Sequence, residues 1–234
     1  MRKGYRGRLF DFAGDIKSPG LKTSYRYFKD GLLLVEDGHV ILTGSYEDII
    51  QQCNATIKIE DFGDALIMPG FFDLHVHSVQ TRAIASYGKA LLDWLDKYIF
   101  PAERLFNNPD YARDNTRFFL NQLLKNGTTT AMVYPSSHEN SVEALFDLAA
   151  ELNIRIISGN TWMDRNAPDY LLKSPEESYD ISNKLIEKYH HKNRNLFAVT
   201  PRYAITSSPK ALKHAAMLFT EQDDLYLQTH ISEN

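Results

Sequence analysis

Hydrophobic and polar positions follow two different patterns along the chain, and the change falls near residue 68. Before that point, apolar runs are short and separated by Gly, Asp and Asn, which is typical of strands joined by tight turns. The sequence Glu36-Asp37-Gly38-His39 predicts a hairpin, because Asp-Gly accepts the positive φ angles of a tight turn. We therefore predict a small, β-sandwich-like unit over residues 1–68, with strands at residues 4–12, 31–36, 39–43 and 56–62.

From Pro69 onward, β-branched apolar runs alternate with segments in which apolar residues recur at helical spacing. Pro175 and Pro209 each follow a serine, which is the order expected of a helix N-cap and first helical residue. Asn126-Gly127 predicts a helix end, because glycine readily takes the left-handed conformation found there. The predicted strands are residues 70–77, 128–134, 154–159, 196–200 and 225–230, and the predicted helices are residues 111–126, 141–153, 175–190 and 209–221.

Strands that alternate with helices predict parallel βαβ units, and polar residues at the strand ends are typical of a (β/α)8 TIM-type barrel. We therefore predict an α/β fold in which residues 69–234 form strands 1 to 5 of such a barrel. A closed barrel needs eight strands. We accordingly expect the C-terminal part to be absent and the chain to be a fragment of a protein about twice as long, with an open parallel edge.

Composition narrows the class of protein. A net charge of −4 gives no electrostatic reason to expect nucleic acid or an anionic membrane as a partner. The single cysteine, Cys53, excludes an intrachain disulfide and fits a reducing compartment. The basic N-terminus is not followed by the apolar stretch of a secretory signal, and no run approaches the roughly 18 apolar residues of a membrane span. We expect a cytoplasmic protein.

Candidate chemistry begins with His75 and His77, which stand one residue apart at the end of the strand predicted over residues 70–77. Side chains alternate across a strand, so both imidazoles point the same way and can share one cation. The alternative is that one histidine is a hydrogen-bonded core residue and the other is incidental. The position after an apolar strand opened by Pro69-Gly70 favours the metal interpretation.

A third histidine, His230, closes the last predicted strand and is followed by Glu233. The ends of barrel strands meet at one face, so His230 could meet the first pair across the barrel mouth. A carboxylate at Glu233 could take a proton from metal-bound water and return it to a leaving group. A lone histidine at a strand end is more often structural, and a loop glutamate is usually solvated.

Several motifs carry a family resemblance. PGFFDLHVH (residues 69–77) and THISEN (229–234) resemble the amidohydrolase superfamily. Within it, WLDKYIFPAE (94–103), KNGTTT (125–130), MDRNAP (163–168) and TPRY (200–203) resemble the guanine deaminases. The resemblance runs along nearly the whole chain.

The resemblance implies a zinc-dependent aminohydrolase that converts guanine and water to xanthine and ammonia. His75, His77 and His230 match the metal-binding histidines of the family, and Glu233 matches its proton shuttle. One zinc ion is the implied cofactor, although iron, cobalt and nickel also accept imidazole. The resemblance further implies a homodimer.

Substrate recognition is implied for three residues, Gln80, Arg202 and Tyr203. Gln80 matches the His-x-x-Gln of the family and can donate and accept hydrogen bonds. Arg202 matches an arginine aimed at the purine carbonyl, and Tyr203 stands where the family often has phenylalanine and can cover the purine face. Trp94 is a weaker candidate for a pocket wall and is expected to pack a helix. Asp73 is placed outside the metal set.

The family completes its site with a histidine after the sixth strand and an aspartate after the eighth, and neither can be assigned in this sequence. We therefore expect this chain alone to be unstable or inactive. Three alternatives stay open. One is a deaminase of another purine or a pterin. A second is a PHP-type metal phosphoesterase, since DLHVHS (73–78) resembles its opening motif. The third is a truncated relative that has lost catalysis and serves in binding or assembly.

Overall fold

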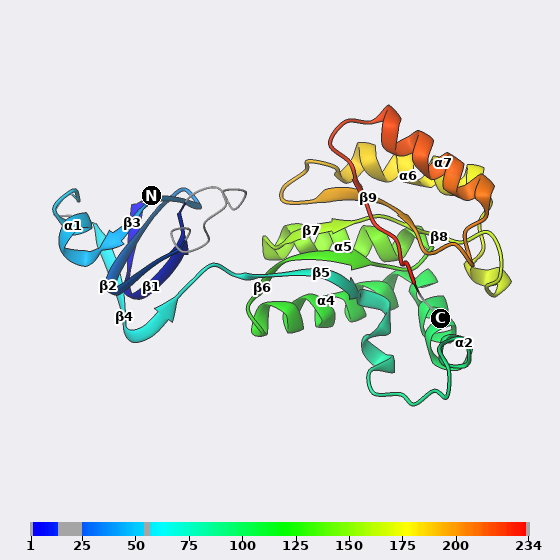
Figure 1. The fold of residues 1–234 in the computed structure, drawn as a ribbon, viewed down its shortest axis with the longest axis horizontal. Coiled ribbons are helices and arrows are strands. Elements are labelled where there is room, and N and C mark those ends of the chain that lie inside the picture. The colour runs from blue at the N-terminus through cyan, green and yellow to red at the C-terminus, as the bar shows by residue number, and fades with distance from the viewer. Residues whose placement is uncertain (1, 14–24, 54–56, 233–234) are drawn as a thin grey trace. The chain divides into compact units, whose positions relative to one another are not determined.

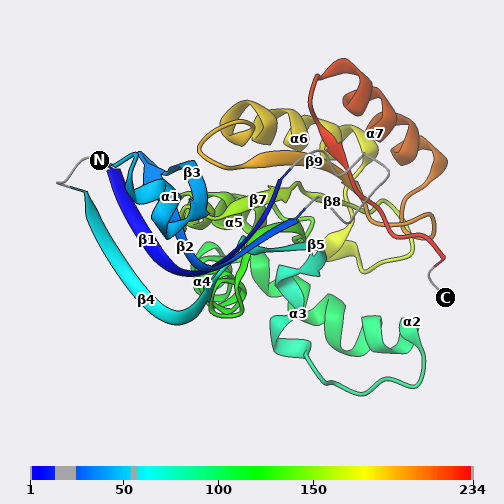
Figure 2. The same cartoon turned by 60° about the vertical axis from the view of Figure 1, so that its left-hand side comes forward.

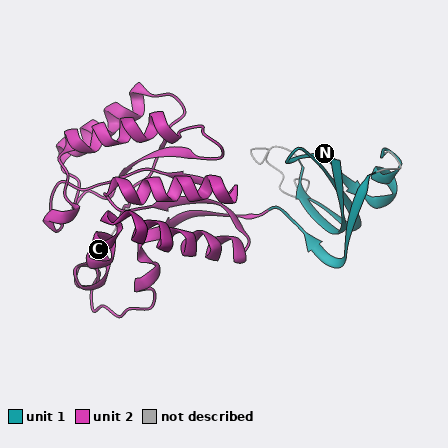
Figure 3. Ribbon diagram, turned by 180° about the vertical axis from the view of Figure 1, so that it is seen from behind, with its two compact units in different colours: residues 1–69 teal, residues 70–234 magenta. Residues whose placement is uncertain are grey.

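The computed structural model describes residues 2–13, 25–53 and 57–232. The chain divides into two compact units, Met1–Pro69 and Gly70–Asn234 (Figure 3). Each unit has a sheet of its own. Within the described ranges, no helix combines the length and the apolar character needed to cross a membrane.

The first unit is built on one sheet with the strand order β3-β2-β1-β4. The β1–β2 and β2–β3 pairs are antiparallel, and β4 runs parallel to β1. The predicted hairpin between β2 and β3 is confirmed, since Asp37 and Gly38 have φ angles of 50° and 81°. The strands are β1 (Arg2–Phe12), β2 (Tyr25–Glu36), β3 (His39–Ser45) and β4 (Lys58–Ile67).

One helix covers this sheet where the sequence predicted a sandwich-like arrangement. Helix α1 (Tyr46–Ile50) begins after Ser45, whose hydroxyl accepts a hydrogen bond from the Asp48 N–H. Its Ile49 packs on Leu32 and Leu34 of β2, and all three are buried. Within the described residues of the first unit, the four strands form a single sheet.

The second unit is an α/β structure with parallel strands that lie side by side in chain order (Figure 1). The strands are β5 (Phe71–His77), β6 (Thr128–Tyr134), β7 (Arg155–Ser158), β9 (Leu196–Pro201) and β10 (Tyr226–Leu227), with β8 (Thr161–Trp162) paired to β9. The helices between them follow the same order (Figure 2) and are α4 (Pro109–Lys125), α5 (Glu139–Leu152), α6 (Pro175–Tyr189) and α7 (Pro209–Glu221).

Local sequence signals account for the ends of these helices. The Ser174 hydroxyl accepts from the Glu177 N–H at the start of α6, and the Ser208 hydroxyl accepts from the Ala211 N–H at the start of α7. Both caps satisfy backbone donors that a helix start leaves unpaired. After α4, Gly127 has a φ of 82°, as predicted for the residue that ends this helix.

The helices bury their apolar faces against one face of the sheet. The main core joins side chains from α4, α5, α6 and α7 to those of β6, β7 and β9. In β6, Val133 points into this core. Since side chains alternate across a strand, the next residue, Tyr134, points to the opposite face. That opposite face carries the candidate site.

The segment between β5 and α4 contains short helices that the sequence analysis did not predict. They are a 3-10 helix (Ser78–Ala83), α2 (Leu91–Trp94), a π-helical turn (Leu95–Ile99), α3 (Phe100–Arg104) and a second 3-10 turn (Leu105–Asn107). Ile99 and Phe100 pack with Met163 and Leu171 in a second core beneath this segment.

Strand β5 lies at one edge of the sheet in the described residues. Phe71, Phe72 and Leu74 are each more than half exposed there. At the other edge, Tyr226 and Leu227 of β10 are also exposed. The predicted open parallel edge is therefore present at β5, and apolar side chains are exposed on both edge strands, β5 and β10.

Candidate functional site

The C-terminal end of β5 carries the first two histidines of the candidate site. Val76 packs against the main core on the helix side of the sheet. His75 and His77 therefore share the opposite side, as alternation along a strand requires. Their ring centroids lie 5.3 Å apart.

His230 reaches the same place from the far end of the chain. The sequence predicted that it would close a strand over residues 225–230, but β10 is confined to Tyr226–Leu227. After β10 the backbone leaves the ladder and follows the Arg202 segment, where the His230 N–H donates to the Arg202 carbonyl at 2.9 Å. The Gln228 side chain anchors this segment by donating to the Val133 carbonyl and to Thr200 Oγ1, both at 3.0 Å.

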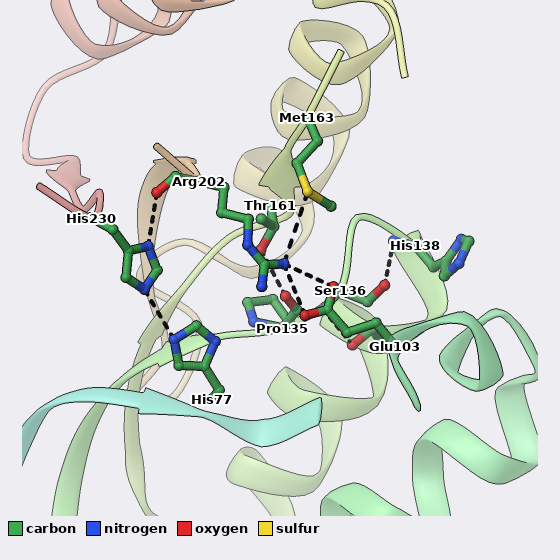
Figure 4. Close-up of polar contacts among 10 residues, drawn as sticks. His77, Glu103, Pro135, Ser136, His138, Thr161, Met163, Arg202 and His230 are labelled. Atoms are coloured by element: carbon green, nitrogen blue, oxygen red, sulfur yellow. Dashed lines mark hydrogen bonds and ion pairs between the residues drawn. The ribbon is translucent and has the colours of Figure 1, made fainter. Parts of the chain in front are cut away.

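The ligand atoms of His75, His77 and His230 all lie within 4.8 Å of one another. The Nε2 atoms of His77 and His230 approach to 3.0 Å, and their rings face each other in Figure 4. Nδ1 of His230 lies 2.8 Å from the Arg202 carbonyl oxygen. Because a carbonyl only accepts, Nδ1 carries the proton and Nε2 is the unprotonated nitrogen, which is the form that can bind a metal ion.

Electrostatics favour the neutral form of His77. Burial, assisted by the positive charge of Arg202 and by the two neighbouring histidines, lowers the pKa of His77 to about 2. Neutral imidazole is the form that binds a metal ion.

The three imidazoles fit a divalent cation of the zinc type. Nitrogens bound to one zinc ion at about 2.0–2.1 Å lie about 3 to 3.5 Å apart. The 3.0 Å separation of the His77 and His230 Nε2 atoms is close to this range. Within the described residues, these side chains form the cluster of His, Cys, Asp or Glu groups that could hold an ion.

Tyr134 forms the floor beneath the histidines, and the sequence analysis did not identify it. Its ring stacks on His77 at 4.8 Å with an interplanar angle of 16°, and its centroid lies 4.3 Å from that of His230. Only 2% of its surface is exposed. Its position could have identified it, because it is the last residue of β6, the strand that pairs with β5. Side chains at the C-terminal ends of neighbouring parallel strands lie close together.

A cavity of about 250 Å³ opens beside the histidines. Gln80, Arg202 and Tyr203, which the resemblance had singled out, all line it. Trp94 lines it too and also packs against the second core, and its Nε1–H donates to Ser86 Oγ at 3.0 Å. The full lining is His75, His77, Gln80, Trp94, Leu95, Arg202, Tyr203 and His230. Glu233 lies outside the described residues.

Arg202 is buried, with 4% of its surface exposed, and is paired with Glu103 of α3. Its Nη1 donates to both carboxylate oxygens, at 2.8 and 3.0 Å (Figure 4). Glu103 is fully buried. Burial raises the pKa of the Glu103 carboxyl, and the Arg202 guanidinium opposes that rise by favouring the charged form. The sequence analysis missed Glu103 because its partner is remote in the chain.

Two aspartates near strand ends have local tasks. Asp73 Oδ1 accepts from the His75 backbone N–H at 3.1 Å, which fixes the backbone ahead of the first histidine. Asp164 accepts from the Ser208 N–H at 2.7 Å and so fixes the start of α7. Neither carboxylate belongs to the histidine cluster.

Residues 66–234 match the model of the amidohydrolase family. The chain belongs to this family. It is 44% identical to guanine deaminase of Escherichia coli (strain K12) over 99% of its length and 53% of that protein. A PHP-type phosphoesterase, one of the alternatives, is a different family and is set aside by this match.

Solved structures of relatives have the same fold. The structure of E. coli guanine deaminase superposes with a TM-score of 0.94 at 44% identity, covering 99% of this chain and 54% of that one. A guanine deaminase from C. acetobutylicum, with guanine bound in its active site, superposes with a TM-score of 0.87 at 30% identity, covering 100% of this chain and 54% of that one. The chain thus spans about half the length of these members of the amidohydrolase family.

Proposed function

We propose that this chain belongs to an enzyme that hydrolyses guanine to xanthine and ammonia. The observation that carries the proposal is the single cavity that joins the three histidines to Gln80, Arg202 and Tyr203. These residues are the ones that the guanine deaminase resemblance assigns to the metal and to the purine. The 44% identity to the E. coli enzyme along 99% of the chain supports the same substrate.

His75, His77 and His230 would hold one divalent cation, for which zinc is the preferred candidate and iron the main alternative. When bound there, zinc supplies water activation at neutral pH, because it lowers the pKa of a water ligand to about 7. The protein's contribution is the orientation of the ligands. The Arg202 carbonyl fixes the tautomer of His230, and the Asp73 carboxylate fixes the backbone of His75.

The substrate would lie against the side chains that line the cavity. Arg202 is a fixed cationic donor and suits the carbonyl oxygen of guanine. Gln80 can donate and accept on the same purine edge, while Tyr203 covers a face of the ring. Glu233 is the proposed proton shuttle, which would transfer the two protons of the water molecule in turn, the first to the ring nitrogen and the second to the departing amine.

We further propose that the second unit is the first part of a (β/α)8 barrel and that the active protein is about as long as its relatives. Support comes from the chain order of the parallel strands and from the exposed apolar side chains of β5 and β10. Residues from the rest of such a protein would complete the site. A cytoplasmic location and a homodimer remain predictions.

The test uses the protein expressed from its natural gene. Its intact mass is measured first, and a value well above the 26.8 kDa of this chain is expected. The zinc-loaded protein is then incubated with guanine, and loss of guanine absorbance is followed together with ammonia release. Guanine should be consumed with one ammonia per xanthine formed. Faster turnover of adenine or a pterin would reassign the substrate, and no turnover of any of the three would favour a non-catalytic relative.

A further inference from the structure

Glu103 is a charged side chain with no exposed surface, and the proposed reaction gives it no task. It lies on α3, in the short-helix segment between β5 and α4. Its charge is matched by Arg202, which follows β9 and lines the cavity. A buried ion pair at the wall of a pocket needs an explanation, since two apolar residues often stabilise a fold as well as a buried pair does.

We infer that Glu103 is a positioning residue for substrate recognition, because it holds one end of the Arg202 guanidinium and leaves the other end to donate to the 6-oxo group of a purine. The inference rests on the proposed function, in which Arg202 meets the purine carbonyl. It adds a residue that acts through Arg202 and does not itself touch the substrate.

The hydrogen bonds of the guanidinium support this division of tasks. Nη1 donates to both oxygens of Glu103 and lies 3.9 Å from the Met163 sulfur. Within the described part of the chain, all hydrogen bonds recorded from the Arg202 side chain leave from this one nitrogen. Nε and Nη2 are therefore the donors that remain for a ligand, since a guanidinium has five N–H groups in a fixed fork.

The surroundings fix the guanidinium further. Its Cζ atom lies 5.4 Å from the centre of the Phe100 ring, on the same helix as Glu103. Figure 4 shows the guanidinium between the Glu103 carboxylate and the Met163 sulfur. A long, flexible side chain is thus held in one conformation before a substrate arrives, which lowers the entropy lost on binding.

A carboxylate suits this position better than a neutral acceptor. An amide could accept one hydrogen bond from Nη1, but it would leave the buried guanidinium charge without a counter-ion. The guanidinium would then be drawn towards water or towards other acceptors in the site. The interaction with a purine carbonyl, which depends on a fixed donor, would suffer more than contacts with the purine ring.

The ion pair also connects two parts of the pocket wall. Trp94 and Leu95 line the cavity at the start of the π-helical turn, and Glu103 follows on α3. Single π-helical turns are frequent at functional sites. Through Glu103, the segment that carries Trp94 is attached to the segment that carries Arg202.

The test compares the binding of two inert ligands by calorimetry. Hypoxanthine carries the 6-oxo group but no 2-amino group, and purine carries neither. The zinc-loaded full-length protein should bind hypoxanthine more tightly than purine. Glu103→Gln keeps the size of the side chain and removes its charge. It should weaken the binding of hypoxanthine at least tenfold and the binding of purine less than twofold. Equal affinity of the wild type for both ligands, or a preference that Glu103→Gln leaves unchanged, would overturn the inference.

Two further variants separate positioning from general destabilisation. Leu185→Ala removes a buried side chain of α6 outside the cavity, so it should lower the unfolding temperature and leave the preference for hypoxanthine intact. Glu103→Asp keeps the charge and shortens the side chain by one carbon, and its preference should lie between those of the wild type and Glu103→Gln. If Glu103→Gln does not fold, Glu103→Asp decides, and an unaltered preference there overturns the inference.

The outcome is independent of the deamination assay. If guanine is not hydrolysed but the preference for hypoxanthine exists and depends on Glu103, the proposed function fails and the positioning role stands. If guanine is hydrolysed while the preference is the same in wild type and Glu103→Gln, the proposed function stands and the positioning role is wrong.

Discussion

The Nε2 atoms of His77 and His230 lie 3.0 Å apart, although 153 positions separate the two residues in the sequence. One belongs to the first strand of the second unit and the other to the segment after β10. An ion held by both would tie two edges of the same parallel sheet together. Metal binding and the integrity of the sheet are therefore expected to depend on each other.

Replacement of His77 should abolish metal binding. His77→Ala removes one of three imidazoles, and structural and catalytic zinc sites need at least three protein ligands. We therefore expect the zinc content to fall from about one ion per chain to less than about a tenth of that value. Inductively coupled plasma mass spectrometry measures the content. His39→Ala, an exposed histidine of the first unit, serves as the control and should keep its metal. Retention of zinc by His77→Ala would contradict the assignment.

Trp94→Phe should weaken substrate binding with little effect on the chemical step. The variant keeps an aromatic ring at the cavity and loses the hydrogen bond from Nε1 to Ser86 Oγ. A neutral hydrogen bond is worth about 0.5–1.5 kcal/mol, so KM for guanine should rise about 2- to 12-fold while kcat stays within about twofold. Steady-state kinetics measure both. Tyr87→Phe, an exposed neighbour, should change neither, and a fall in kcat alone for Trp94→Phe would refute the prediction.

Gly159→Ala should destabilise the second unit. A Cβ at residue 159 would lie 2.1 Å from the Ala198 carbonyl oxygen and 2.8 Å from the Phe197 ring. Overpacking of this kind typically costs about 1–3 kcal/mol. Urea denaturation followed by tryptophan fluorescence reports this unit, because both tryptophans, Trp94 and Trp162, belong to it.

The control for this substitution is Gly4→Ala in the first unit. A Cβ there would meet only side-chain atoms of Ile59, Leu32 and Leu34, at 3.1–3.3 Å. The tryptophan-detected transition should therefore be unchanged. If Gly159→Ala unfolds at the wild-type urea concentration, the close approach of residue 159 to β9 is not a constraint on the fold.

The first unit should lose part of its stability in acid through Asp11. The hydrogen bond from the Arg26 guanidinium, assisted by the Thr43 hydroxyl, holds the pKa of Asp11 below its usual value of about 3.9. The folded state therefore binds the proton less tightly than the unfolded state. The stabilisation is present above about pH 4 and is lost as the pH falls through the lower, folded-state pKa.

Comparison of wild type with Asp11→Asn measures this contribution. Because Arg26 is partly exposed, we expect only about 0.2–1 kcal/mol at pH 7. Hydrogen-exchange protection of β1 is compared between the two proteins at each pH, so that the intrinsic exchange rate cancels. The difference should shrink towards zero as the pH falls to about 2. A difference that is constant from pH 7 to pH 2 would mean that the charge of Asp11 does not stabilise β1.

Elements with a strong local pattern were predicted closely. Strand β6 spans Thr128–Tyr134 and helix α7 spans Pro209–Glu221, as the sequence indicated. In both cases the prediction used signals that span only a few residues, namely the residues that start the element and the spacing of its apolar positions. The helices between residues 78 and 107 were missed; residues 91–107 form one continuous helical stretch, but a π-helical turn and a 3-10 turn interrupt the regular spacing of an α-helix.

The site was predictable where a residue type is itself informative. Histidines at strand ends pointed to chemistry by themselves, whereas Gln80, Arg202 and Tyr203 were implied by the family resemblance, and all six predicted residues line one cavity. Glu103 was missed because its partner Arg202 is 99 positions away, and nothing local distinguishes a buried glutamate from a solvated one. Tyr134 was missed because an aromatic residue that ends a strand usually belongs to the core.

Arg202 serves the site through two different parts of the same residue. Its backbone carbonyl accepts a hydrogen bond from His230 Nδ1–H, while its side chain lines the cavity. Every amino acid supplies that carbonyl, so replacement of the side chain leaves the support of His230 in place. Provided that Glu103 changes with it, residue 202 can evolve towards a new substrate without loss of the metal centre. Substitutions at this one position can therefore change the substrate specificity while the reaction itself is retained.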